Sequence, residues 1–278
     1  MSYKSILVHL DDHKSCAGRI LAAIALAQTH DAHLTGLYVA AEPALPGSLR
    51  AEIPPDFMRT ILEQQQDVMA TAKRSFVETA TKAGLNADCR TVRTTSSLIA
   101  SVVSLHARYA DLVVLGQPES DARGETELSD AEDVVMAAGR PSLIIPYIGA
   151  GDGFGRRAMV AWDGGREAAR AVGDAMPMLE KAESVAVVVV NPKSGDHGAE
   201  PGADIALHLA RHGIKVEAQH LEARDMSVAD TILSRAADQS IDLLVMGAYG
   251  HSRFREWVLG GATRQIFAQM TVPVLMSH

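Results

Sequence analysis

The sequence contains only two cysteines among 278 residues, and Cys16 and Cys89 are far apart and not in a CxxC arrangement. This excludes a disulfide framework and a four-cysteine zinc site as organising features. The chain also lacks an uninterrupted apolar run of the ~18 residues that a membrane helix needs. Its first residues lack the apolar stretch and cleavage site of a signal peptide. We therefore expect a cytoplasmic protein with no membrane partner.

Positive charge is in short supply, since 26 Lys and Arg face 34 Asp and Glu and the formal net charge is −8. Polyanions are bound by basic surfaces, so nucleic acid is not an expected partner. The sequence lacks a P-loop and a nucleophile elbow, and we predict no catalytic residue. His208 and His212 have a spacing that can bind a metal on a helix. No third ligand is evident nearby, so we predict no metal site and interpret His212 as a helix-dipole partner.

The sequence does contain an internal repeat. Residues 5–11 (SILVHLD) match residues 157–163 (RAMVAWD), and residues 110–116 (ADLVVLG) match residues 241–247 (IDLLVMG). The offset is 152 positions at the first match and 131 at the second, so the second copy is about twenty residues shorter between its first and fourth strands. We predict two domains, residues 1–148 and 154–278, separated by a glycine-rich linker.

Within each copy, short apolar strands alternate with amphipathic segments, as in parallel sheets covered by helices on both faces. Each domain is predicted to be a Rossmann-like α/β unit, with a five-stranded parallel sheet in the order 3-2-1-4-5. In the second copy the expected strands lie near 157–162, 185–190, 214–221, 241–246 and 272–276, and the expected helices near 165–180, 202–212, 227–238 and 261–270. In the first copy the second helix is longer, from about 55 to 84.

The segment GAYGHSRFREWVLGGAT, at 247–263, follows the fourth strand of the second copy. Glycine allows a backbone to approach phosphate oxygens closely, and the free amides at a helix start favour an anion. Asp163 follows the first strand, which is the neighbour of the fourth at the switch point of a sheet with this order. Asp163 and Gly247 should then line one crevice. The alternatives are ordinary turn glycines and an aspartate that caps a turn before Gly164 and Gly165.

The pattern Gly-x2-Gly-x9-Gly at 247, 250 and 260, together with AWDGG at 161–165, resembles the universal stress protein family. The likeness extends over essentially the whole chain, once per half, as in tandem members of the family. It implies binding of ATP, with or without Mg, by the second domain, where Asp163 and Val190 contact the base and Ala161 also belongs to the site. Ribose and phosphate contacts then fall on Met246, Gly247, Gly250, Gly260, Gly261 and Ala262. Gly261 replaces the usual Ser or Thr, which removes a hydroxyl contact worth about 0.5–1.5 kcal/mol.

The first copy has no second glycine three residues after Gly116. Acidic residues occupy the region where phosphates would lie, and their charge repels an anion: Glu119, Asp121, Glu125, Glu127, Asp130, Glu132 and Asp133. We predict that this domain has lost the phosphate site.

The function expected from these features is a stress-response role in which an adenine nucleotide regulates the protein, with at most slow ATP hydrolysis. The family resemblance also implies that the two domains pair through their last strands as an intramolecular pseudo-dimer, and further homodimerisation stays open. One alternative is a nucleotide-independent interaction or chaperone-like protein. A second is an adenylating enzyme of the ATP-pyrophosphatase type, whose Ser-Gly-Gly-x-Asp-Ser loop AWDGGREA matches only in part.

Overall fold

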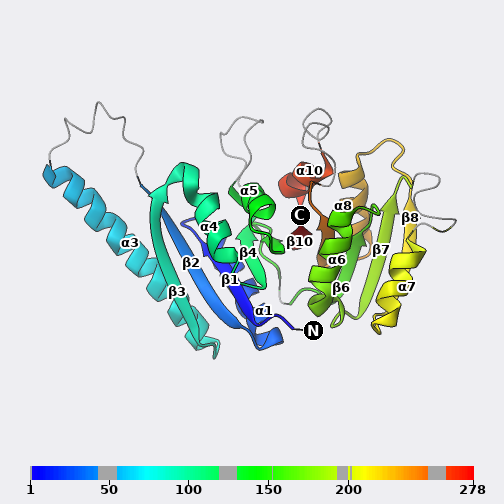
Figure 1. Cartoon of the computed structure of the whole chain (residues 1–278), viewed down its shortest axis with the longest axis horizontal. Helices are drawn as coiled ribbons and strands as arrows, with labels where there is room; N and C mark the ends of the chain where they lie inside the picture. Colours follow the sequence, from blue (N-terminus) through cyan, green and yellow to red (C-terminus); the bar gives the residue numbers. More distant parts are fainter. Residues whose placement is uncertain are drawn as a thin grey trace.

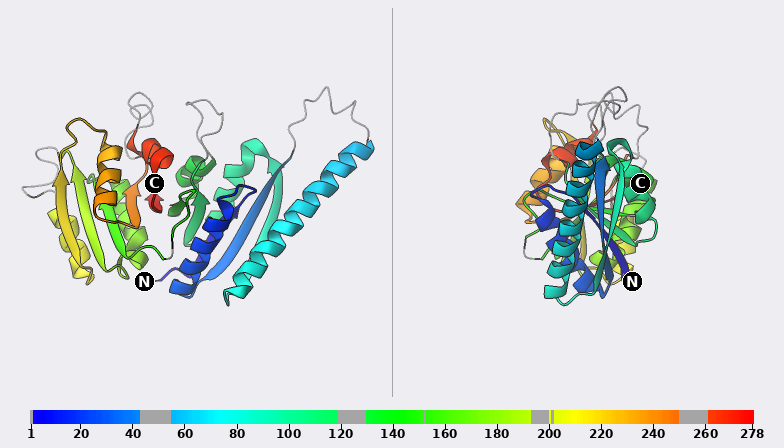
Figure 2. Two further views of the ribbon diagram at one scale, coloured as in Figure 1. Left: turned by 180° about the vertical axis from the view of Figure 1, so that it is seen from behind. Right: turned by 90° about the vertical axis from the view of Figure 1, so that its left-hand side faces the viewer.

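The computed structural model of this chain describes residues 2–42, 55–118, 130–151, 153–192, 200, 202–249 and 261–278. In this part of the chain, ten strands form one continuous sheet with helices packed on both of its faces (Figures 1 and 2). Both termini lie near the middle of the molecule, where the two halves meet. None of the described helices is both long and apolar enough to cross a membrane.

The N-terminal half contains five strands, which are β1 (Ser5–Leu10), β2 (His33–Glu42), β3 (Ala87–Thr95), β4 (Leu112–Gly116) and β5 (Ser142–Ile145). Its described helices are α1 (Cys16–His30), α3 (Pro55–Lys82), the 3-10 helix η1 (Ser96–Leu98), α4 (Ile99–Ala107) and α5 (Asp130–Ala137). The C-terminal half contains β6 (Arg157–Ala161), β7 (Ser184–Val190), β8 (Val216–Leu221), β9 (Leu243–Gly247) and β10 (Val274–Ser277). Its described helices are α6 (Arg166–Leu179), α7 (Ala203–Arg211), α8 (Val228–Asp238) and α10 (Ala262–Gln269).

The strand order across the sheet is β3-β2-β1-β4-β5-β10-β9-β6-β7-β8. Each half therefore has the predicted order 3-2-1-4-5, and its strands are parallel to one another. The halves join through their last strands, because β10 pairs antiparallel with β5 and places Val274 opposite Ile144. The predicted intramolecular pairing of the last strands is confirmed.

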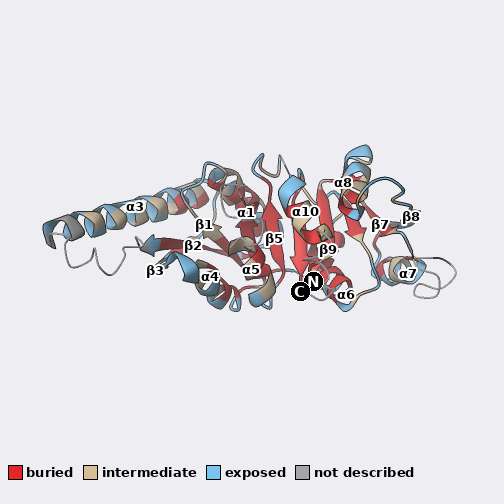
Figure 3. Cartoon of the chain, turned by 90° about the horizontal axis from the view of Figure 1, so that it is seen from above, coloured by how far each residue is buried: buried red, intermediate tan, exposed pale blue. Residues whose placement is uncertain are grey.

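The central strands are buried on both sides because their sequences are almost entirely apolar, and all four residues of β5 and of β10 are buried. Such strands are stable only when helices cover both faces of the sheet. One apolar cluster lies under α1, α3, α6 and α7, and the second lies under α4, α5, α8 and α10. Figure 3 shows the buried residues concentrated in the sheet and on the helix faces turned toward it.

The predicted length difference between the halves is confirmed, since α3 has 28 residues and its counterpart α7 has 9. In Figure 3, α3 extends well beyond the sheet at its N-terminal end. Its C-terminal part is anchored by Phe76, which is fully buried. Phe76 lies on Gly36 of β2, where an added Cβ would be only 2.8 Å from the ring, so glycine is required there for this helix to pack.

Polar contacts also tie the two halves together. Gln117, just after β4, donates its amide to the carbonyl of Phe267 on α10 at 2.8 Å. On the other face, Lys181 after α6 donates to the carbonyl of Thr29 on α1 at 3.0 Å. These bonds hold the junction on both sides of the β5–β10 pair.

Candidate functional site

The carboxyl ends of β6, β7 and β9 meet at one edge of the C-terminal half. Ala161 lies opposite Met246 on β9 and opposite Val188 on β7. Gly247 ends β9, and Asp163 follows β6 by two residues. The fold therefore brings this part of the predicted site to one edge of the sheet, at its switch point.

An apolar surface accompanies this edge. Ala161, Val190 and Ala262 are each partly exposed and pack against the cluster that contains buried Met246. They come from three different elements, β6, β7 and α10. Partly exposed apolar side chains of this kind suit the face of a planar ring, because the ring removes apolar area from water on both partners.

Asp163 is exposed and accepts a hydrogen bond from the backbone N–H of Gly165 at 2.8 Å through Oδ1. Gly165 is the N-cap residue of α6, so the aspartate stabilises the turn that starts this helix. The alternative interpretation of Asp163 as a turn residue is therefore confirmed. Among the described residues no cation pairs with Asp163, and its Oδ2 remains available to accept a further hydrogen bond.

Packing alone requires a glycine at position 247, which was not predicted from the sequence. An added Cβ would lie 2.5 Å from the backbone nitrogen of Ala168 and 2.7 Å from the carbonyl carbon of Glu167. The first turn of α6 thus lies directly against the end of β9, and only glycine leaves room for it. The available signal was the small residues at the start of α6, Gly165 and Ala168, which permit such an approach.

The start of α10 lies beside the residues that follow β9. Gly261 is its N-cap residue, and no side chain caps the first turn. Uncapped helix N-termini favour anions through their free N–H groups and the helix dipole. Thr263 in this turn is buried, and its hydroxyl lies 3.5 Å from the N–H of Tyr249. Gly250 and Gly260 of the glycine pattern, and the basic residues His251, Arg253 and Arg255 between them, lie outside the described residues.

The equivalent place in the N-terminal half is filled by an arginine. Arg19 of α1 forms an ion pair with Asp11 at 2.7 Å, and its side chain is only 3 % exposed. The guanidinium also lies on Gly116 at the end of β4, where an added Cβ would be 2.7 Å from it. Burial alone would raise the pKa of Asp11, but the charge and hydrogen bond of Arg19 outweigh burial and hold that pKa below its ordinary value. Asp11 is therefore engaged within the protein.

Sequence reasoning did not find Arg19. One arginine on a long helix is normally interpreted as a solvated residue. The signal was its surroundings, because α1 reads CAGRILAAIALAQTH and carries no other charged side chain except a terminal histidine.

A contact between the halves reaches the glycine segment itself. Tyr249, two residues after Gly247, is buried in a left-handed conformation and donates its hydroxyl to Glu132 of α5 at 2.7 Å. Arg264 of α10 lies 3.7 Å from the same carboxylate. Glu132 was predicted to repel phosphate in its own half, but the structure shows it bonded across the junction to the other half. Glu119, Asp121, Glu125 and Glu127 lie outside the described residues.

Within the residues described, no group of three or more His, Cys, Asp or Glu side chains is arranged to hold a metal ion. The rings of His208 and His212 contact each other edge to face at 5.0 Å. Cys16 and Cys89 are both buried free thiols.

Comparisons with known proteins add to this geometry. The model of the universal stress protein family matches residues 155–278. The C-terminal half belongs to the universal stress protein family. A stretch of 67 residues is also 39% identical to a universal stress protein of Synechocystis, but this covers only 24% of the present chain and 22% of that relative.

Solved structures extend the likeness in fold to both halves. A universal stress protein from Archaeoglobus fulgidus is similar over 98% of this chain and 95% of its own, with a TM-score of 0.78 at 15% identity. A putative universal stress protein from Pseudomonas aeruginosa is similar over 99% of this chain and 93% of its own, with a TM-score of 0.62 at 14% identity. The N-terminal half therefore shares its architecture with two-domain universal stress proteins.

Proposed function

We propose that the C-terminal universal stress protein domain binds ATP or a related adenine nucleotide, and that the protein acts in a cytoplasmic stress response through this binding. The observation that carries the proposal is the contrast between the two aspartates. Within the part of the chain that the structure describes, Asp163 keeps a carboxylate oxygen available, whereas Asp11 is paired with Arg19. An available acceptor at a switch point can bind the amino group of a base or a ribose hydroxyl.

The surroundings of Asp163 support the same ligand. The partly exposed side chains of Ala161, Val190 and Ala262 suit an adenine ring. The uncapped start of α10, with Gly261 at the N-cap, suits the phosphates. Neither feature requires a catalytic group, so we propose a regulatory function in which ATP hydrolysis is slow or absent.

Equilibrium binding of fluorescent ATP with Mg²⁺ tests the proposal. The wild-type chain should bind one ATP, and Asp163→Asn should weaken binding by about tenfold or more, since it removes the charge that accepts the hydrogen bond. The same change in the other half, Asp11→Asn, is the matched control and should leave ATP affinity unchanged. The proposal is wrong if ATP fails to bind at millimolar concentration, or if both variants bind it as the wild type does.

One observation favours the alternative of a nucleotide-independent interaction protein. Gly247 is required by the packing of α6, so that glycine is explained without any ligand. A chain that protects a client protein from aggregation equally well with and without ATP would support this second function.

A further inference from the structure

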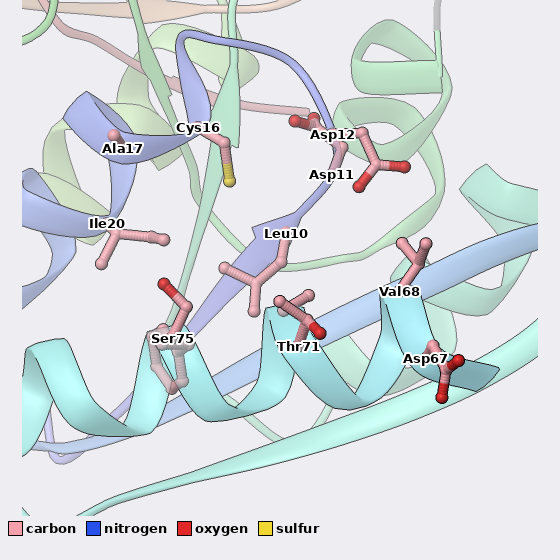
Figure 4. Close-up of a pocket in the computed structure, with 12 residues that line it drawn as sticks. Leu10, Asp11, Asp12, Cys16, Ala17, Ile20, Asp67, Val68, Thr71 and Ser75 are labelled. Carbon is pink, nitrogen blue, oxygen red and sulfur yellow. The ribbon is translucent and has the colours of Figure 1, made fainter. Parts of the chain in front are cut away.

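The N-terminal half contains a cavity of about 500 Å³ between α1 and α3, beside the end of β1. Figure 4 shows α3 along one side of the cavity, α1 along the other and the Leu10–Asp12 segment at its end. Cavities of this size are typical of small-molecule sites. The cavity uses α3, the helix that has no counterpart of similar length in the C-terminal half.

The cavity has an apolar body. Leu10 of β1 and Phe76 of α3 are buried and form its floor, and Ile20 of α1 forms a wall. Val68 of α3 is 46% exposed at its edge, so a ligand there would cover apolar surface that water now contacts. In Figure 4 the hydroxyl of Ser75 is directed from α3 toward the space between the two helices.

The charged residues that line the cavity are all acidic. They are Asp11, Asp12 and Asp67, and no Lys or Arg is among the lining residues. Arg19 neutralises Asp11 from outside the cavity. Asp12 accepts a hydrogen bond from the hydroxyl of Tyr38 at 2.8 Å. Within the described chain, neither Asp12 nor Asp67 has a cationic partner. About two negative charges therefore remain beside an apolar hollow.

From this combination we propose that the α1–α3 cavity is a second ligand site, and that it binds an amphipathic organic amine. The apolar body of the amine packs on Leu10, Ile20 and Phe76. Its ammonium group lies at the end formed by Asp11 and Asp12, where a partly desolvated charge pair is stronger than in bulk water. The same carboxylates exclude nucleotides and other anions, so the two halves would take ligands of opposite charge.

The experiment compares three probes of nearly equal size by calorimetry at neutral pH: 2-phenylethylamine, 2-phenylethanol and 3-phenylpropionate. The amine should bind saturably, the alcohol about tenfold more weakly and the acid not detectably. Asp12→Asn should weaken amine binding by about tenfold and leave binding of the alcohol unchanged. The asparagine oxygen can still accept the hydrogen bond from the Tyr38 hydroxyl.

Location is tested by filling the cavity. Thr71→Trp places a large side chain in it from an exposed position of α3 and should abolish amine binding. Lys73→Trp makes the same change at an exposed position of α3 that does not line the cavity, and should bind the amine as the wild type does. Thermal melting of both variants checks that they fold. The proposal is overturned if the amine does not bind, if it binds no more tightly than the alcohol, or if folded Thr71→Trp retains full affinity.

Discussion

The two halves of this chain share one topology but differ in the side chains at the switch point of the sheet. In the N-terminal half a buried arginine joins Asp11 and covers the end of β4. When Asp11 is aligned with Asp163, the residue equivalent to Arg19 is Ala171, which is buried and too small to reach the aspartate. The side chain at this position of the first helix thus decides whether a cation pairs with the aspartate: Arg19 pairs with Asp11, and no described cation pairs with Asp163.

The largest effect should come from removing that arginine. Arg19→Met leaves the Asp11 carboxylate partly buried without its cation, and we expect a loss of about 3 kcal/mol in the free energy of unfolding. Urea denaturation measures it. The double variant Arg19→Met, Asp11→Asn should recover much of the loss, whereas Asp163→Asn alone should cost less than about 0.5 kcal/mol. Equal losses in the free energy of unfolding for Asp163→Asn and Arg19→Met would show that the two aspartates contribute alike to the stability of their halves.

The glycines that end β4 and β9 should also respond differently. Gly247→Ala places a Cβ against the backbone of α6, which cannot move without shifting the helix, so we expect a cost of about 2–3 kcal/mol. Gly116→Ala meets only the end of the Arg19 side chain and should cost less. The two denaturation midpoints give the comparison directly. A milder effect at Gly247 than at Gly116 would show that α6 adjusts freely.

Tyr249→Phe tests the bond that links the halves at the glycine segment. Removing the hydroxyl leaves the buried Glu132 carboxylate with one partner fewer, and a loss of about 1–2 kcal/mol is expected. The affinity for ATP should fall as well, because Tyr249 helps to position the end of β9. Tyr109→Phe, at a residue that is 77% exposed, is the control and should change neither quantity.

A further difference is absent at neutral pH and develops only in acid, and it arises from two histidines of the N-terminal half. Burial, helped by Arg19, lowers the pKa of His9 to about 4. Burial, helped by Lys181, likewise lowers the pKa of His30 to about 4. Between pH 6.5 and about 4 the unfolded chain binds protons that the folded chain does not, so stability should fall as pH falls through this window. Denaturation at several pH values should show a flatter slope for His9→Asn, His30→Gln, and an unchanged slope would contradict the assignment.

The sequence predicted most of the fold because its signals were local and repeated. Apolar runs such as VAVVVV at 185–190 can hardly form anything but a buried parallel strand, and the second copy matched the predicted elements closely. The position of Asp163 was predicted, since strand order alone brings it to the edge where β9 ends. Neither Arg19 nor the bond from Tyr249 to Glu132 was predicted. Tyr249 and Glu132 are 117 positions apart, and no periodicity marks which side chains will meet at that distance. The Arg19–Asp11 pair is local, but its only signal was the absence of other charges on the apolar helix α1 apart from a terminal histidine.

The antiparallel pairing of β5 with β10 has a consequence for synthesis. β5 ends at Ile145, and β10 begins at Val274, which is 129 positions later. At typical rates of elongation, synthesis of the residues between β5 and β10 takes roughly ten seconds or more, and during this time one edge of β5 is unpaired. An apolar open edge is a template for pairing with another chain. The newly made N-terminal half therefore carries an aggregation-prone edge from the moment it folds. That edge is covered only after β10 has been translated and has paired with β5.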